Sequence, residues 1–476
     1  MSRIPVPLGP ASDKSKARQG GGSIITNGYV EKTEGGKSGF SINCRPRLRL
    51  FGNTGADAPV RGVCAINGSE LYVIAGEGAY SIGPGGAATY LGVVIGQKPC
   101  TMSFNRKSPH RQIAITADTK NYVIENSVLT EVTDPDLPSG SHSNCNSNGY
   151  TIYGINDGLA YASAENDSTS INALAFAEAE RSTDPGVRVL EVGEDFWYFG
   201  TKSREVFRIV GTSDPFPFEP LLGAGLGEGS GCAARFSPAL LGGFVAWVND
   251  YFQVVLSGGG APEPISNHEV DRDIERAMKL GYTDEITSFS YDTEGHQFYV
   301  LRSPIWCWAY DLATGFWAPW KSYQSDTFKC GHYAYCYNKD LVGGHDGKLY
   351  ELTFDAMDDD GEACVMEIEV SPPNAFPDGY ICDAFHLDIQ RGVGIASGAA
   401  HTQDPQVLLS VSRDGGMTWG RTYARSAGQQ GKYAKDIRWN RLGSCNGTGM
   451  GFKLSLPEPV SKAVFQAAVD LRPLRN

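Results

Sequence analysis

The chain has 476 residues, of which 41% are hydrophobic and 11% aromatic, and 58 are glycine. Such a length exceeds one ordinary core, and many glycines with few long helical periods favour an all-β protein of two or three domains. No run of about 18 apolar residues occurs, so the sequence predicts no membrane insertion. Acidic residues number 54 and basic residues 41, and the net charge of -13 argues against a basic face that grips nucleic acid.

The amino-terminal residues 1–23 are rich in Pro, Gly, Lys and Ser and show no apolar period, so we expect a flexible arm. They also lack the apolar core of a secretory signal. Eleven cysteines are scattered from Cys44 to Cys445 without the dense spacing of a disulfide scaffold, and we expect reduced thiols in the core. Both features indicate folding in a cytoplasm.

The first strand signal lies at residues 38–50. Arg45, Arg47 and Arg49 alternate with apolar neighbours, which in a strand would place three guanidinium groups on one face. Such a face is either a solvated edge strand, protected from aggregation by its charge, or a contact with an acidic partner or nucleic acid. The three arginines are therefore candidates for a partner contact.

A loose repeat of short β segments, each with a tyrosine, begins after residue 61. The tyrosines are 37 to 53 residues apart by subtraction of their numbers, close to the roughly 40 to 50 residues of a propeller blade. The pattern predicts a β-propeller over residues 24–353. It has six blades if the last segment shares a blade with the first, which we prefer, and seven otherwise. The repeated positions are Tyr72, Tyr122, Tyr161, Tyr198, Tyr251, Tyr299 and Tyr350.

One amphipathic helix, over residues 268–280, interrupts the strands. Asn267 can cap its start, apolar residues recur on one face from Val270 onward, and Gly281 can end it. We expect it to pack between blades. After it, residues 305–310 are apolar at both alternating sets of positions, which is typical of a strand buried on both faces.

At residues 355–362 the composition changes from alternating β segments to an acidic tract, and we place a domain boundary there. The remaining residues 366–476 hold further alternating strands, consistent with a separate β-sandwich. Within this domain, residues 408–425 predict a hairpin whose turn contains Asp414, Gly415 and Gly416.

The same hairpin matches the S-x-D-x-G-x-T-W pattern of the Asp-box, which occurs in sialidases and other propeller proteins, at Ser412, Asp414, Gly416, Thr418 and Trp419. The carboxylate can accept hydrogen bonds from turn N–H groups, glycine takes a positive φ, and the tryptophan can bury against the sheet. The motif therefore predicts a structural turn without a catalytic group. Its place outside the predicted propeller differs from sialidase boxes, which lie on the blades.

No catalytic constellation can be assigned from spacing. A sialidase-like enzyme should have several Asp-boxes, an arginine cluster and an activated tyrosine, and only one box is present. Cys330, His332, Cys336 and His345 could form a metal site, but alternation along one strand also explains them, and their spacing matches no closed zinc pattern. The sequence predicts no catalytic residue, metal or cofactor. A carbohydrate-binding or sialidase-like propeller remains the alternative function.

Three sets of segments carry a resemblance to a known family. They are residues 31–38 (EKTEGGKS) with 46–51 (PRLRLF), residues 61–63 (RGV) with 67–73 (NGSELYV), and residues 412–419 (SRDGGMTW) with 438–443 (RWNRLG) and 451–454 (GFKL). In this order, over nearly the whole chain, they resemble the packaged DNA stabilisation, or tail hub, proteins of short-tailed bacteriophages. The chain departs from that family in its long arm before Gly28 and in its many cysteines.

The resemblance implies a structural virion protein and no enzyme. It implies a propeller with an added β domain, assembled in the host cytoplasm as a homo-hexameric ring of the virion tail, the tail hub or nozzle. Such a ring lies below the portal and the head-to-tail adaptor, closes the head after DNA packaging, and supports the tail needle, fibres or spikes. DNA passes through its lumen without specific binding. Together with the net charge of -13, this leads us to expect acidic residues on the inner wall.

Overall fold

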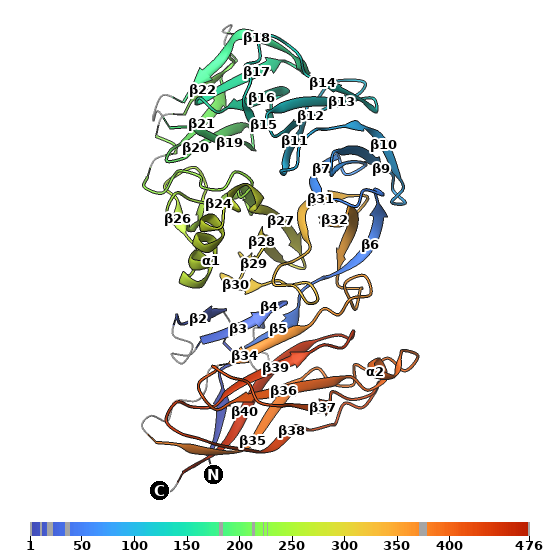
Figure 1. Cartoon of the computed structure of the whole chain (residues 1–476), viewed down its shortest axis with the longest axis vertical. Coiled ribbons are helices and arrows are strands. Elements are labelled where there is room, and N and C mark those ends of the chain that lie inside the picture. Colours follow the sequence, from blue (N-terminus) through green and yellow to red (C-terminus); the bar gives the residue numbers. More distant parts are fainter. Residues whose placement is uncertain are drawn as a thin grey trace.

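A computed structural model of the chain describes residues 2–9, 12–16, 22–33, 39–179, 184–211, 215–221, 223–225, 227–370 and 378–474. Its paired strands are antiparallel and gather into two bodies, a propeller and a β-sandwich, which lies below the propeller in Figure 1. The fold is therefore all-β with a propeller and a sandwich, as the sequence predicts.

Seven four-stranded sheets among the described residues form the blades of the propeller (Figure 1). The first three blades contain β7 (Val60–Ile66), β8 (Glu70–Ala75), β9 (Gly78–Ile82) and β10 (Ala88–Val93); β11 (Cys100–Phe104), β12 (Gln112–Ala117), β13 (Lys120–Glu125) and β14 (Val128–Glu131); and β15 (Ser141–Ser147), β16 (Tyr150–Ile155), β17 (Leu159–Ala164) and β18 (Asp167–Glu178). The next three contain β19 (Gly186–Val192), β20 (Asp195–Gly200), β21 (Arg204–Ile209) and β22 (Phe218–Pro220); β23 (Ala239–Leu241), β24 (Phe244–Val248), β25 (Val254–Ser257) and β26 (Glu263–Pro264); and β27 (Thr287–Thr293), β28 (His296–Ser303), β29 (Trp306–Asp311) and β30 (Phe316–Pro319).

The seventh blade closes the ring with strands from both ends of the propeller sequence. It contains β31 (Cys330–Cys336), β32 (Lys339–Gly344), β33 (Lys348–Thr353) and, as its outer strand, β6 (Arg47–Asn53). The register runs from Lys348 opposite Asn53 to Thr353 opposite Arg47. Closure of this kind hydrogen-bonds the start of the propeller to its end and leaves only short edges.

The preference for six blades is corrected to seven, the count that the tyrosine spacing left open. Six of the seven repeated tyrosines lie on strands of six different blades, and Tyr251 lies in the turn between β24 and β25 of the remaining blade. The six-blade count required Tyr72 and Tyr350 to share a blade. They do not, because β33 pairs with β6, a strand upstream of the first tyrosine.

Apolar faces meet between neighbouring blades and form the propeller core. One cluster joins the first and second blades, and another packs Trp197 of β20 against Trp247 of β24 across the fourth and fifth blades. Every residue of β29 is buried, as expected from its apolar character at both alternating sets of positions. The eleven cysteines are free thiols, and all are buried.

The predicted helix is present as α1 (His268–Lys279). The Asn267 side chain accepts hydrogen bonds from the N–H groups of Glu269 and Val270, which is the ordinary way to cap a helix start. Its buried face packs between the fifth and sixth blades, where the indole N–H of Trp306 donates to the carbonyl of Asp273 at 2.8 Å. Within the described residues, the other helical segments are η2 (Thr283–Glu285) and α2 (Ala400–Gln403). No helix within the described ranges has the length and apolar character needed to cross a bilayer.

Two six-stranded sheets make the sandwich, and one apolar core fills the space between them. One sheet has the order β38-β35-β40-β5-β4 with β1 also on β40; the other has the order β2-β3-β34-β39-β36-β37. Their strands are β1 (Ser2–Val6), β2 (Asp13–Lys14), β3 (Gly22–Thr26), β4 (Gly28–Lys32), β5 (Phe40–Cys44), β34 (Met366–Val370), β35 (Tyr380–Ile389), β36 (Gln406–Ser412), β37 (Thr422–Ser426), β38 (Ile437–Cys445), β39 (Gly451–Leu456) and β40 (Ala463–Pro473).

The amino-terminal part of the chain differs from the flexible arm expected over residues 1–23. Among its described residues, β1 pairs with β40, and Val6 and Leu8 enter the sandwich core. Strands β3, β4 and β5 also belong to the sandwich, so the propeller begins at β6 and not at residue 24. Composition could not reveal this, because a few apolar side chains and the pairing partner more than 450 residues away fix the segment.

We predict that the closing strand β6 stabilises the propeller through its inward side chains. Leu48→Ala should lower the free energy of unfolding by about 2 to 5 kcal/mol, because Leu48 is 1% exposed within the core of the last two blades. Leu50→Ala on the same strand, where the side chain is 46% exposed, should change it by no more than about 0.5 kcal/mol. Denaturant unfolding measures both, and equal effects would contradict the position of β6.

Candidate functional site: the junction of the two domains

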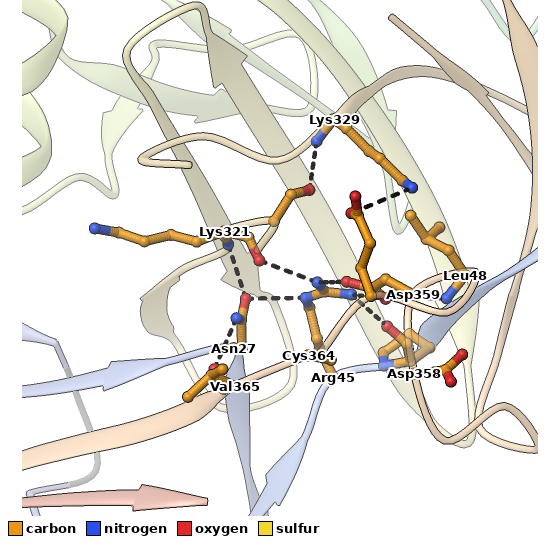
Figure 2. A network of polar contacts seen from close by, with 12 residues as sticks. Asn27, Arg45, Leu48, Lys321, Lys329, Asp358, Asp359, Cys364 and Val365 are labelled. Atoms are coloured by element: carbon orange, nitrogen blue, oxygen red, sulfur yellow. Dashed lines mark hydrogen bonds and ion pairs between the residues drawn. The ribbon is translucent and has the colours of Figure 1, made fainter. Parts of the chain in front are cut away.

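The two domains are joined by two neighbouring crossings of the chain. One leads from β5 through Arg45 and Pro46 into β6, and the other leads from β33 through residues 354–365 into β34. Figure 2 shows the side chains where the crossings meet. A buried polar network at this junction connects the propeller with the sandwich.

Arg45 lies at the centre of the junction and pairs with Asp359 from the second crossing. Its Nη2 lies 2.6 Å from Asp359 Oδ2 and its Nη1 3.2 Å from Oδ1, and both side chains are 0% exposed. The remaining donors are also used: Nε donates to Asn27 Oδ1 at 3.0 Å, and Nη1 and Nη2 donate to the carbonyls of Pro46 and Lys321. A buried charge is tolerated when it is paired and hydrogen-bonded in this way.

The side chains of Asn27 and Asp359 connect the two domains through hydrogen bonds. Asn27 of the sandwich accepts a hydrogen bond from the N–H of Lys321 in the propeller at 2.8 Å and donates to the carbonyl of Val365 at 2.9 Å (Figure 2). Asp359 accepts from the N–H of Leu48 on β6 at 3.1 Å. Loss of either side chain would therefore leave unpaired groups in both domains.

Burial alone would lower the pKa of the Arg45 guanidinium, but the carboxylate of Asp359 outweighs it and the net pKa is raised. The guanidinium also lies over the ring of Phe328, 4.8 Å from its centroid, and 5.7 Å from that of Trp320. Arg45 is thus charged and enclosed between a carboxylate and aromatic rings.

The predicted partner face of Arg45, Arg47 and Arg49 is corrected for two of the three residues. Arg45 precedes the strand and is enclosed, and Arg47 is 4% exposed and donates to the carbonyls of Ala356 and Val460. Only Arg49 is exposed, 3.7 Å from Glu351. The prediction failed for Arg45 because β6 begins at Arg47, after the crossing. It failed for Arg47 because residues 356 and 460, which follow the propeller in the chain, cover this end of the strand.

Sequence reasoning missed the partners of Arg45. The acidic tract was interpreted as a boundary only, although Asp359 within it is fully buried. The sequence did contain a signal for this ion pair. The acidic tract at residues 355–362 follows the propeller and the arginine run precedes it, so the two runs can lie side by side and form ion pairs. Asn27 offered no comparable signal.

A second contact across the junction involves an aromatic ring and a histidine. Tyr29 of β4 meets His296 of β28 edge to face, with ring centroids 5.0 Å apart. His296 Nδ1 lies 2.8 Å from Asp311 Oδ2. The hydrogen bond to Asp311 raises the pKa of His296, against the opposing effect of burial.

The Asp-box turn lies at the far end of the sandwich hairpin β36–β37. Asp414 Oδ1 accepts from the N–H groups of Met417 and Thr418 at 3.0 and 2.9 Å, and Oδ2 accepts from the Thr418 hydroxyl at 2.6 Å. Ser412 Oγ accepts from the N–H of Gly416, which has φ 89°. These bonds, those from Thr418 first, lower the pKa of Asp414. Trp419 is half-buried, with Lys453 Nζ 5.8 Å from its ring centroid. The arrangement stabilises a turn.

The described residues contain no group of three or more His, Cys, Asp or Glu side chains placed to hold a metal ion. Cys330 and His332 lie on β31, but a register shift between them breaks the alternation that would have placed them on one face. Burial lowers the pKa of His332 to about 3.

The decisive comparison concerns both domains. Residues 29–357 match the family model described as "Bacteriophage P22 Gp10, beta-propeller", and residues 367–472 match "Bacteriophage P22 Gp10, beta-sandwich". The chain belongs to the bacteriophage P22 Gp10 family. It is therefore a Gp10-like DNA stabilisation and tail protein, a structural component of the virion and not an enzyme. The family assignment replaces the sialidase-like alternative.

Comparison with solved structures finds propellers of distant sequence. A virginiamycin B lyase from Staphylococcus aureus is 10% identical, with 65% of this chain and 99% of that chain covered and a TM-score of 0.46. The WD40 propeller domain of Doa1 is 11% identical, with 64% and 96% covered and a TM-score of 0.40. At these values the likeness supports no functional argument. No curated protein sequence matches the chain.

We predict that breaking the junction pair destabilises the Gp10-like chain strongly. Arg45→Met or Asp359→Asn should each lower the free energy of unfolding by about 3 to 5 kcal/mol, because each leaves a buried charge or its partners uncompensated. Arg49→Met removes an exposed arginine four residues away and should cost no more than about 1 kcal/mol. In denaturant unfolding, the double variant Arg45→Met/Asp359→Asn should lose less stability than the sum of the losses of the two single variants. Additive losses would show that the two groups do not interact.

A pH dependence is expected from His296. Its pKa is raised in the folded chain above the unfolded value of about 6.5, so its stabilising effect is fully present below about pH 6.5 and is lost as pH rises through the folded pKa. The free energy of unfolding of the wild type should therefore exceed that of His296→Gln most at acidic pH. Unfolding of both proteins between pH 5.5 and 8.5 measures the difference. A difference that grows with pH would contradict the Asp311 contact.

Proposed function

We propose that this Gp10-family chain forms the homo-hexameric ring of the tail hub, below the portal and the head-to-tail adaptor. The ring closes the head after DNA packaging and supports the tail needle, fibres or spikes. The observation that carries the proposal is the match of both domains, in order, to the two domains of the family. A fixed junction between them suits a protein that must hold neighbouring tail components at constant spacing.

Charge supports the passage of DNA through such a ring. Each subunit contributes a net charge of -13, so a closed ring carries a large negative charge. Acidic residues on the inner wall repel phosphate, whereas a basic wall would hold DNA by releasing counterions. The ring follows from a heterologous contact repeated around one axis until it closes.

The partner contact expected of the arginine run is now restricted to Arg49. Arg45 and Arg47 are enclosed by protein, and their replacement by glutamate would unfold the junction. Arg49 lies on the outer strand of the seventh blade, with 47% of its side chain exposed. We infer that it faces a neighbouring tail protein.

Particles assembled without this protein test the function. We predict that their packaged DNA becomes sensitive to nuclease, and that added wild-type protein restores protection because it closes the head. Arg49→Glu should fold normally, since an exposed strand charge contributes little to stability, but it should restore protection poorly. Arg208→Glu, another exposed arginine that pairs with Asp195 in the fourth blade, is the matched control and should restore it fully.

Three results would contradict the proposal. Stable, nuclease-protected particles without the protein would refute head closure. Normal restoration by Arg49→Glu would remove this residue from the partner surface and leave the hub function standing. Tight, salt-sensitive DNA binding by the purified protein would refute passage without specific binding.

A further inference from the structure

Four arginines and two histidines lie around the axis of the propeller, on or near the inner strands of the blades. They are Arg61 of β7, His142 of β15, Arg188 of β19, Arg302 of β28, His332 of β31 and Arg235 of the segment before β23. The charge of Arg188 affects groups in three other blades, which indicates that its guanidinium lies near the axis. From the fourth blade it interacts electrostatically with Cys100 of the second, His142 of the third and His332 of the seventh.

Arg188 and Arg235 lack the partners that buried arginines require. In the described part of the chain, Nε and Nη1 of Arg188 and Nε of Arg235 are buried without a hydrogen bond, and no carboxylate forms an ion pair with either residue. His142 is 3% exposed, and its ring interacts with the Ser143 hydroxyl and with the backbone of Ile155. Guanidinium nitrogens that are shielded from water in a partly buried side chain ordinarily pair with an acceptor or an anion.

Other enclosed arginines of this protein show the ordinary arrangement. Arg45 pairs with Asp359, Arg61 donates to the carbonyls of Gly76, Val94 and Lys98, and Arg302 donates to the carbonyl of Phe328 at 2.6 Å. Single nitrogens of other arginines, such as Arg61 Nη2 and Arg47 Nε, are also buried without a hydrogen bond, but both side chains donate through other nitrogens. Within the described residues, Arg188 and Arg235 differ in that neither side chain donates a hydrogen bond.

The electrostatics agree with an uncompensated positive charge. Burial lowers the pKa of Arg188 to about 10, with Arg235 contributing in the same direction. Burial, Arg235 and Arg188 lower the pKa of His142 to about 3, so this ring is neutral at pH 7. The two guanidinium groups repel each other, and a shared anion would convert that repulsion into attraction.

We propose that the propeller axis binds a small inorganic oxyanion of the phosphate class, held by the guanidinium groups of Arg188 and Arg235. The planar fork of a guanidinium matches two oxygens of a tetrahedral oxyanion, and two forks can hold one ion. Both side chains are only partly buried, so solvent space adjoins them and an ion can enter. The guanidinium of Arg188 lies 6.0 Å from the ring centroid of Phe236, the residue that follows Arg235, which places the two arginines in one region of the axis.

Titration calorimetry and thermal unfolding of the full-length wild type with inorganic phosphate, at constant ionic strength set with chloride, test the site. One phosphate should bind per chain, and the melting temperature should rise with phosphate and reach a plateau, because the folded state binds the ion and the unfolded state does not. Adenosine triphosphate in a parallel series separates free phosphate from a nucleotide phosphate, which should bind weakly if the axis admits only a small ion.

Matched variants assign the site. Arg188→Met/Arg235→Met should abolish the phosphate response and, without phosphate, should melt no lower than the wild type, because it removes two unpaired charges. Arg208→Met removes an exposed charge from the same blade and should keep the response. Arg188→Lys keeps the charge but loses the fork and should weaken binding about ten-fold, which tests the site if the double variant fails to fold.

Absence of a saturable response in the wild type would overturn the proposal. An unchanged response in the double variant, or in Arg188→Lys where the double variant does not fold, would also overturn it. A response lost equally in Arg208→Met would show a nonspecific effect of net charge and would count against the site.

Discussion

The arrangement of this Gp10-family protein depends on one buried ion pair. Arg45 and Asp359 come from the two crossings between the domains, and both are excluded from water. The pair is worth little by itself, because removal of two charges from water offsets much of their attraction. The pair instead favours one relative orientation of the two domains. Every N–H group of Arg45 has an acceptor, and Asn27 is hydrogen-bonded to both domains. In another orientation these buried charged groups would lose their partners.

The chain path makes the sandwich the frame and the propeller an insertion within it. Strands β1 to β5 precede the propeller and β34 to β40 follow it, yet all belong to the two sheets of the sandwich. Strand β6 then closes the last blade as soon as the chain leaves the sandwich. Both ends of the propeller are thus attached to the sandwich at one place, next to the ion pair (Figure 1). Two adjacent crossings of the chain therefore connect the propeller to the sandwich.

Sequence patterns predicted those features whose determinants are local. The capped helix α1, the doubly buried strand β29 and the hairpin at Asp414 each depend on residues within about 20 positions, and periodicity indicates them. The individual strands after the acidic tract were indicated in the same way, but their partners β1 to β5 were not. The blade number, the role of residues 2–44 and the burial of Arg45 depend on pairings across 300 residues or more, to which no local pattern refers. The arginine alternation misled because strand periodicity holds only inside a strand, and Arg45 precedes one.

The insertion has a consequence for the order of events during synthesis. The first strands of the sandwich emerge from the ribosome long before their partners: β5 ends at Cys44, and β34 begins at Met366. At about 5 to 20 residues per second, the interval is on the order of a quarter of a minute to one minute. Throughout it the propeller can build blade by blade, while β3 exposes an edge that would pair with β34, and β1 and β5 expose edges that would pair with β40. The nascent chain thus passes through a stage at which a finished domain carries an unpaired amino-terminal segment, and chaperone protection is most needed there.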